Sequence, residues 1–197
     1  MKTTRLALVV LVMGFVACQS GQNQQPVDET KNQVVEAIMS RRSIRAYKPE
    51  QVKDEELKTI IECAINAPSA GNRQSWAVRV IQNPELLKEI GDESIRLSER
   101  NLFFNAPTLI VVAADETDVQ SHENCGLLTQ NILLAAESMS IGTCVIGLLV
   151  PSLNAETILP QLNIPDTHKI IYAISLGYKD EAPDARPRDA SKVQIIK

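Results

Sequence analysis

The chain has 197 residues, of which 44% are hydrophobic and 22% are charged, so it can bury the core of an ordinary domain and is not disordered throughout. Its formal net charge of −4, from 20 basic and 24 acidic residues, argues against a protein dedicated to nucleic acid. Four cysteines in a chain of this length do not make a disulfide scaffold, and two separated histidines do not favour a metal site, so no metal is expected.

The beginning of the chain, residues 1–17, is typical of a secretory signal peptide. Two basic residues precede an apolar run, residues 6–16, which is too short to span a bilayer because a spanning helix needs about 20 residues. The run ends just before Cys18, as in bacterial lipoproteins, whose cysteine is lipidated after cleavage. Phe15 departs from the Leu that is usual there. The alternatives are an ordinary signal peptide with a chance cysteine, or an amphipathic start of a cytosolic protein.

Residues 18–30 are predicted to be a flexible tether and residues 31–197 the folded domain. The mature protein is then expected to be an exported lipoprotein, anchored on the periplasmic or outer-membrane face only through its lipid; without export it would be cytoplasmic. If Cys18 is lipidated, an odd number of cysteines remains and they cannot all pair. These are Cys63, Cys125 and Cys144. Their apolar contexts favour buried free thiols over a single disulfide.

The first half of the predicted domain begins with helices. Apolar residues at helical spacing predict a short helix over residues 34–39 and a second one over 54–65. Residues 67–72 are rich in helix-breaking types. The alternation over residues 76–81 then predicts a strand.

The middle of the chain contains its most apolar segments. Pro84 begins a third predicted helix, and the continuous apolar run 108–114 predicts a strand buried on both faces. The longest predicted helix covers residues 124–140 and is expected to end at Gly142. Because that helix is apolar around most of its circumference, it must bury more than one face, which predicts a second copy of the chain as its partner.

The last third of the chain mixes short elements. The apolar stretch 144–150 contains Gly147 and is either a loop or a strand with a bulge. A short helix is predicted over 154–159, a strand over 169–176, and a β-prone segment over 193–196. Helices and strands do not alternate regularly, so the predicted class is α+β rather than a doubly wound sheet.

Two segments supply arginines that suit a phosphate, because guanidinium groups offer forked, charge-assisted donors. Their residues are Arg41, Arg42, Ser43 and Arg45 after the first helix, and Arg186 and Arg188 in the tail. The alternatives are a basic helix end, which the helix dipole favours, and a solvated tail.

Two further segments suit a flat heterocycle. The small residues after the second helix let a flat ligand approach the backbone, and the amides of Asn72 and Gln74 each donate and accept. Gly147 can leave room for a planar ring. The alternatives are a turn that ends a helix before a buried Trp76, and a plain strand with a bulge.

Together these segments resemble the nitroreductase family of flavin enzymes over roughly residues 34–188. Residues 41–45 match its Arg-Arg-Ser-x-Arg signature, residues 67–74 match its Ala-Pro-Ser-x-x-Asn-x-Gln block, and the strand end at Gly177-Tyr178 follows in family order. The resemblance implies a three-layer α/β/α fold with a mixed, mainly antiparallel sheet. It also implies an FMN-dependent homodimer with the flavin at the subunit interface.

The resemblance assigns FMN binding to residues of all four segments. These are Arg41, Arg42, Ser43, Arg45, Pro68, Ser69, Ala70, Asn72, Gln74, Val145, Ile146, Gly147, Arg186 and Arg188. The arginines would contact the phosphate, ribityl chain or pyrimidine edge, and the others would line the ring. Two departures stand out: Ser75 where the family often has Pro, and Ile146 where some members have Glu, which leaves the substrate side more apolar.

The implied function needs no catalytic acid or base, because FMN carries the chemistry. A reductant, NAD(P)H in the family, would give hydride to FMN N5, and a nitroaromatic, quinone or similar flat acceptor would then be reduced, in ping-pong order. The alternatives are a non-redox flavin- or ligand-binding lipoprotein on the same fold, and other flavin chemistry such as reductive dehalogenation or flavin fragmentation. Export would conflict with the use of NAD(P)H as the electron donor, since NAD(P)H is scarce outside the cytoplasm.

Overall fold

The structure, a computed structural model, describes residues 32–197. The predicted signal peptide, Cys18 and the predicted tether lie outside the described residues. None of the helices formed by residues 32–197 has the length and apolar content that a membrane span requires.

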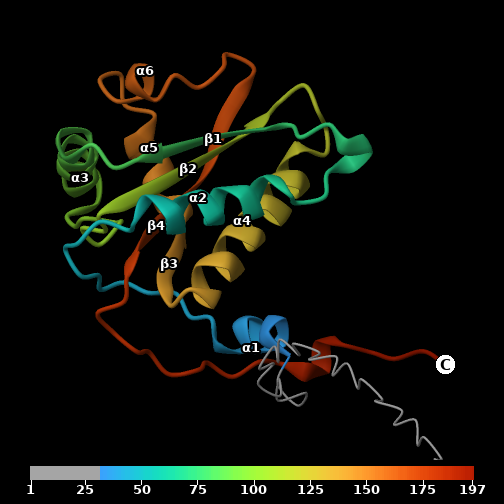
Figure 1. Ribbon diagram of the computed structural model, residues 1–197. Coiled ribbons are helices and arrows are strands. Elements are labelled where there is room, and N and C mark those ends of the chain that lie inside the picture. The colour runs from blue at the N-terminus through green and yellow to red at the C-terminus, as the bar shows by residue number, and fades with distance from the viewer. Residues whose placement is uncertain (1–31) are drawn as a thin grey trace, which may run out of the picture. The chain divides into compact units, whose positions relative to one another are not determined.

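A four-stranded sheet forms the centre of the fold (Figure 1). Its strands are β1 (Trp76–Ile81), β2 (Thr108–Asp115), β3 (Ile141–Ile146) and β4 (His168–Tyr178). Their spatial order is β1-β2-β4-β3, and every neighbouring pair is antiparallel. A single parallel bridge joins Ser43 to Thr143 beside β3. The predicted α+β class and the mainly antiparallel sheet are confirmed.

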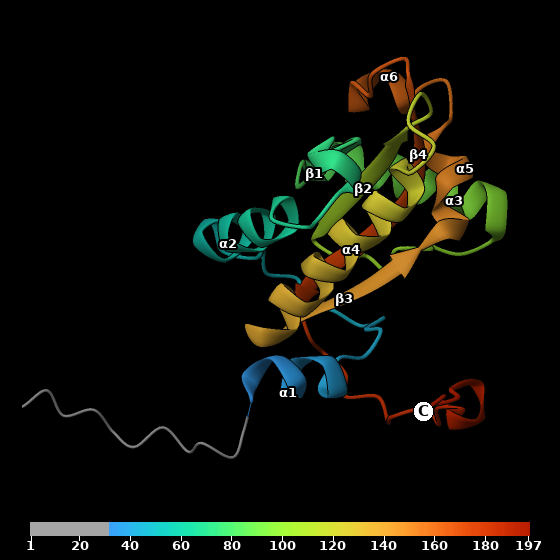
Figure 2. The same ribbon diagram turned by 90° about the vertical axis from the view of Figure 1, so that its right-hand side faces the viewer.

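Helices cover both faces of the sheet, as the predicted three-layer fold requires (Figures 1 and 2). The helices are α1 (Gln33–Ser40), α2 (Asp54–Ile65), α3 (Pro84–Ser98), α4 (Ser121–Ser138), α5 (Val150–Leu153) and α6 (Leu159–Leu162). Residues of α2 and α4 share one apolar core with the sheet, and residues of α3, α5 and α6 share the other. Helix α1 packs against α4.

Strand β2 belongs to both cores. Its side chains alternate between them, with Leu109, Val111 and Ala113 on the α3 side and Ile110, Val112 and Ala114 on the α4 side. Successive strand side chains point to opposite faces, so a central strand covered on both sides needs an uninterrupted apolar run. The prediction of a doubly buried strand at this position is confirmed.

The end of α4 differs from the prediction. Helix α4 stops at Ser138, and Ser140 takes the left-handed turn with φ 61°. Gly142 therefore does not end the helix but lies inside β3. A Cβ at Gly142 would lie 3.0 Å from carbons of Ile44, so this glycine makes room for a neighbouring segment.

Two predicted C-terminal elements are also wrong. Residues 154–158 form turns between α5 and α6 rather than a helix. Pro151 and Pro160 each occupy the first turn of their helix, where the missing N–H does no harm, so each fixes a separate helix start. The segment 193–196 forms no strand, and Ile196 is 88% exposed.

The three cysteines of the described chain are free, but only two are buried as expected. Burial raises the pKa of the Cys125 thiol to about 12, which keeps it protonated and unreactive. Cys63 is exposed, contrary to the prediction, because it lies off the stripe of α2 that buries Ile60 and Ala64.

Candidate functional site

The predicted arginines of two distant segments line one cavity of ≈ 390 Å³, here called the arginine pocket. Its lining residues are Arg41, Arg42, Ser43, Arg45, Pro183, Asp184, Arg186 and Arg188. Five arginines thus share the lining with one carboxylate, and within residues 32–197 none of the five forms an ion pair. An unneutralised group of guanidiniums is the chemistry of a phosphate site.

The loop that carries the first three arginines is fixed to the sheet edge. The Ile44 N–H donates to the Thr143 carbonyl at 2.9 Å, and Ile44 is buried. Tyr47 Oη donates to the Ile44 carbonyl at 2.6 Å and pairs with Ser175 Oγ at 2.7 Å. Burial raises the pKa of Tyr47, so it remains a neutral donor. The loop position is therefore set by the core rather than by the pocket.

The arginines of the pocket differ in the contacts that they make within the protein. Arg42 Nη1 donates to three backbone carbonyls at the end of α1, at 2.8 to 3.0 Å, which is the helix-end role weighed as an alternative. The Arg45 guanidinium lies 5.9 Å from the centre of the Phe104 ring, and its backbone N–H donates to Glu181. Three further side chains form no hydrogen bond within residues 32–197 and can meet a ligand. These are Arg41, Arg186 and Arg188.

The predicted apolar loop lies at the end of β3, an edge strand. Val145 is 37% exposed, whereas Ile146 is buried in the core, so Ile146 offers its backbone rather than its side chain. No atom lies within 4 Å of where a Cβ of Gly147 would be, so the space beside it is open. Gly147 directly follows β3, four positions after Thr143, which bridges to Ser43 of the arginine loop. The arginine pocket and the open glycine therefore lie along one edge.

The turn between α2 and β1, here called the Ser69–Gln74 turn, holds the other predicted residues. Asn72 and Gln74 both have left-handed backbone, with φ of 57° and 52°. For residues other than glycine this conformation costs about 1–2 kcal/mol, so surrounding contacts must hold it. One such contact is the Gln74 N–H, which donates to Ser69 Oγ at 3.0 Å.

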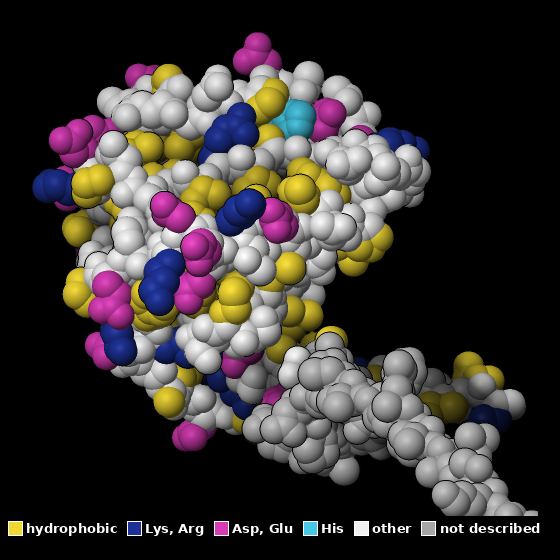
Figure 3. Space-filling view, in the orientation of Figure 1, with side chains coloured by type: hydrophobic (Ala, Val, Ile, Leu, Met, Phe, Trp, Pro, Cys, Tyr) yellow, Lys and Arg dark blue, Asp and Glu magenta, His cyan; other side chains and the backbone are white. Residues whose placement is uncertain are grey.

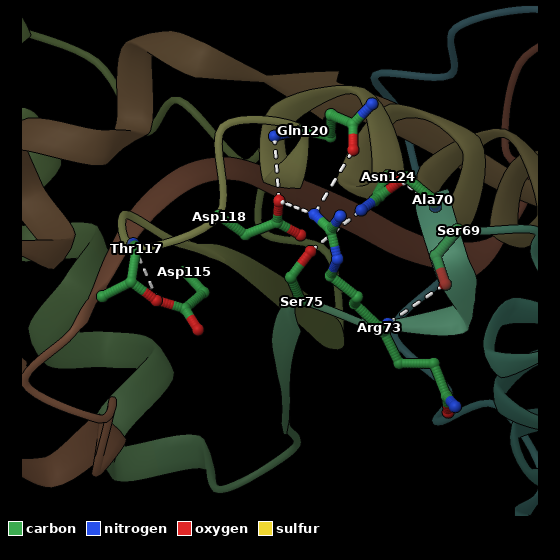
Figure 4. A network of polar contacts seen from close by, with 10 residues as sticks. Ser69, Ala70, Arg73, Ser75, Asp115, Thr117, Asp118, Gln120 and Asn124 are labelled. Atoms are coloured by element: carbon green, nitrogen blue, oxygen red, sulfur yellow. Dashed lines mark hydrogen bonds and ion pairs between the residues drawn. The ribbon is translucent and has the colours of Figure 1, made fainter.

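Side chains of α4 and of the loop that precedes it also hold this turn (Figure 4). Asn124 Oδ1 accepts from the Ala70 N–H at 3.0 Å, and Asn124 Nδ2 donates to Ser75 Oγ at 2.9 Å. Arg73 Nη1 forms an ion pair with Asp118 Oδ1 at 2.6 Å. A hydrogen bond from the Ser75 hydroxyl, and then one from the Gln120 backbone N–H, lower the pKa of Asp118. Among residues 32–197 the other carboxylate oxygen of Asp118, Oδ2, has no hydrogen-bond partner.

The turn and the arginine pocket do not meet within one chain. In both ribbon views the Ala70–Asn72 segment lies far from the loop that follows α1 (Figures 1 and 2). The lining of the arginine pocket includes no residue of the turn, and the cavity beside Gln74 includes none of the five arginines. The predicted residues thus form two separate regions.

The residues that support the two regions were not predicted. Asn124 and Asp118 hold the turn, and Tyr47 and Glu181 hold the arginine loop. Their partners are distant in the sequence and become neighbours only in the fold. One signal was available, since Asn124 precedes the apolar residues Leu128 and Ile132 by four and eight positions and so lies on the same face of α4.

Comparison with known proteins identifies the family. The nitroreductase family model matches residues 38–101 and 92–178. A nitroreductase with bound FMN from Desulfitobacterium hafniense superposes with a TM-score of 0.78 at 32% identity, over 85% of this chain and 100% of that one. A nitroreductase with bound FMN from Bacteroides fragilis gives 0.78 at 26% identity, over the same shares. An NADPH-flavin oxidoreductase of Vibrio harveyi is 29% identical over 83% of this chain and 73% of its own.

The chain belongs to the nitroreductase family. It is an FMN-dependent oxidoreductase, and the predicted fold and cofactor are confirmed. The residues present fit that cofactor, because the unpaired arginines suit its phosphate and the open space at Gly147 suits a flat ring. On the face shown in Figure 3, basic and acidic side chains are interspersed rather than gathered in a stripe.

Proposed function

We propose that this protein moves electrons in two half-reactions, from NAD(P)H or another reductant to a flat acceptor such as a nitroaromatic or a quinone. The observation that carries the proposal is the arginine pocket together with the open space at Gly147, the residue that follows β3. The arginine pocket and the space at Gly147 would hold FMN, which would supply the hydride-transfer chemistry. The name of the Vibrio harveyi relative supports a nicotinamide donor.

The role of the chain's own residues is to bind FMN and to orient it. Arg41, Arg186 and Arg188 hold the phosphate by charge-assisted hydrogen bonds, since their side chains have no other partner among residues 32–197. Gly147 leaves the ring its space. Cys144 lies near this region, and burial raises its pKa despite the opposing influence of Arg45, so it stays a protonated thiol and takes no part as a nucleophile.

We propose that the active form is a homodimer in which the Ser69–Gln74 turn of one copy meets the arginine pocket of the other. Helix α1 exposes large apolar side chains, including Val34 at 64% and Met39 at 71%. A largely apolar cavity of ≈ 420 Å³ lies between α1, α2 and α4, and hydrophobic side chains also reach the surface in Figure 3. Contiguous exposed apolar surface marks a contact with a partner. Sedimentation of the FMN-loaded chain as a monomer at micromolar concentration would contradict this.

The proposed reaction is tested by stopped-flow spectroscopy of the FMN-loaded full-length chain without oxygen. Mixing with NADH or NADPH should bleach the visible absorbance of the flavin, and a quinone should restore it. Flavin that binds but never changes redox state would instead support the non-redox flavin-binding lipoprotein. Dehalogenation or flavin breakdown would appear as a halide product or as absorbance that never returns.

We also propose that residues 1–17 direct export and that Cys18 carries a lipid. The short apolar run before Cys18 supports this. Radiolabelled palmitate should enter the wild-type chain and not Cys18→Ala, and equal labelling of the two would contradict it. Since an exported enzyme meets little NAD(P)H, a reduced quinol belongs in the stopped-flow series beside the nicotinamide donors.

A further inference from the structure

Asn124 has no place in the function proposed above, yet it forms hydrogen bonds at both ends of the Ser69–Gln74 turn. It lies at the start of α4, and only 2% of its surface is exposed. We infer that Asn124, together with Ser75, is a positioning residue that fixes the turn and thereby sets the affinity and redox potential of the bound flavin. This inference rests on the proposed function.

The Asn124 amide joins the two ends of the turn. Its oxygen accepts from the backbone N–H of Ala70 at 3.0 Å, and its nitrogen donates to Ser75 Oγ at 2.9 Å (Figure 4). Ser75 is itself buried. An apolar residue at position 124 would leave the Ala70 N–H without its acceptor and Ser75 Oγ without the donor from α4, so the turn would have to rearrange.

The segment between those two ends is the strained part. Asn72 and Gln74 keep left-handed backbone that residues other than glycine leave when their surroundings permit. The Gln74 amide folds back onto the Asn72 carbonyl at 3.3 Å. Relaxation of the backbone would therefore redirect both side-chain amides, which are the groups assigned to the edge of the flavin ring.

Ser75 contributes in a second way. A residue that precedes proline is driven toward extended backbone, so a proline at position 75 would conflict with the left-handed Gln74. Serine permits that conformation and also supplies the oxygen that Asn124 Nδ2 needs. This gives a physical role to the serine noted above as a departure from the family pattern.

Three variants and one control of the full-length chain test the inference. Asn124→Leu keeps the volume and removes the amide. Ser75→Ala removes the hydroxyl that accepts from Asn124 Nδ2 and also interacts with Asp118. Ser75→Pro forces Gln74 out of its conformation. Thr129→Val is the control, because Thr129 is buried on the same helix and within residues 32–197 its hydroxyl has no partner. For each variant the Kd for FMN, the midpoint potential of the bound flavin and the Tm are measured.

Asn124→Leu and Ser75→Pro should each raise the FMN Kd about tenfold and Ser75→Ala about threefold, while Thr129→Val stays within about twofold. The midpoint potential should shift in the first two, by about 30 mV if oxidised and reduced flavin lose affinity unequally by a factor of ten. A change in Tm alone would assign a merely structural role and overturn the inference.

Wild-type Kd and potential in Asn124→Leu would also overturn it. If that variant does not fold, Ser75→Ala and Ser75→Pro decide in its place, since both leave the residues of α4 unchanged. A wild-type chain that binds no FMN would instead defeat the proposed function, and this inference with it.

Discussion

The arginine pocket and the Ser69–Gln74 turn are the two regions that we propose bind the flavin, and they are built in opposite ways. In the pocket, three arginine side chains on a loop and a tail form no hydrogen bond with the rest of residues 32–197. The turn commits its polar groups to internal partners, Asn124 and Asp118 among them, and holds left-handed backbone in place. Capture of an anion needs unpaired charge, whereas recognition of a ring edge needs fixed direction, which internal hydrogen bonds provide.

The largest expected effect is a loss of FMN affinity that riboflavin does not share, and this difference distinguishes the pocket from the turn. Arg41→Ala should weaken FMN binding by about 10- to 100-fold, because one charge-assisted hydrogen bond to the phosphate is lost. Riboflavin, which has no phosphate, should bind nearly as before. Fluorescence titration with both ligands measures the difference, and Lys192→Ala, an exposed residue of the same tail, is the control. Equal losses for the two ligands would contradict the assignment of the pocket to phosphate.

A second substitution disturbs the pocket indirectly, through the packing of β3 against the arginine loop. Gly142→Ala places a Cβ 3.0 Å from carbons of Ile44, the buried residue of the arginine loop, and should destabilise the protein by about 1–3 kcal/mol. The same change should weaken FMN more than riboflavin, because the arginine loop moves and the turn does not. Thermal unfolding and the two titrations measure this.

The matched control for that substitution is Gly126→Ala on α4, where nothing lies within 4 Å of the added carbon. It should stabilise the protein by about 0.5–1 kcal/mol, because alanine is the better helix former. Similar losses of stability in the two variants would remove the case for tight packing between Ile44 and Gly142.

A smaller effect is expected at the turn. Gln74→Ala removes one neutral amide from the ring edge, so FMN and riboflavin should both bind about three- to tenfold more weakly, with their affinity ratio unchanged. The same pair of titrations checks this. A loss confined to FMN would mean that the turn contacts the phosphate end and that the comparison between the two regions is drawn wrongly.

The smallest effect is a pH dependence. The pKa of Asp118 is lowered in the folded protein, so its stabilising contribution is complete above the usual aspartate value of about 3.9 and is lost as the pH falls through the lower, folded value. Asp118→Asn should therefore be less stable than wild type at neutral pH, with a difference that shrinks below about pH 4. Urea unfolding across that range measures it, and a difference independent of pH would refute the role of the charge.

Sequence patterns predicted the parts of this protein that depend on local chemistry. The apolar run of β2 and the stripe of α2 follow directly from periodicity, and the arginines were visible as residue types. The convergence of these arginines in one pocket was not visible, because it requires the C-terminal tail to lie beside the loop that follows α1. The support by Asn124 was equally hidden, since its partners lie about fifty positions away. The end of α4 was misplaced because Ser140, rather than a glycine, takes the left-handed turn.

The central claim is that one FMN is held by the arginine pocket of one copy and the Ser69–Gln74 turn of another. A mixed dimer of Arg41→Ala and Gln74→Ala chains, isolated with two different tags and titrated with FMN, tests it directly. If the regions come from different copies, one site in the mixed dimer carries both defects and the other carries none, so half of the sites should bind with wild-type affinity. If each chain forms its own site, every site carries one defect, and a titration with no wild-type phase would contradict the claim.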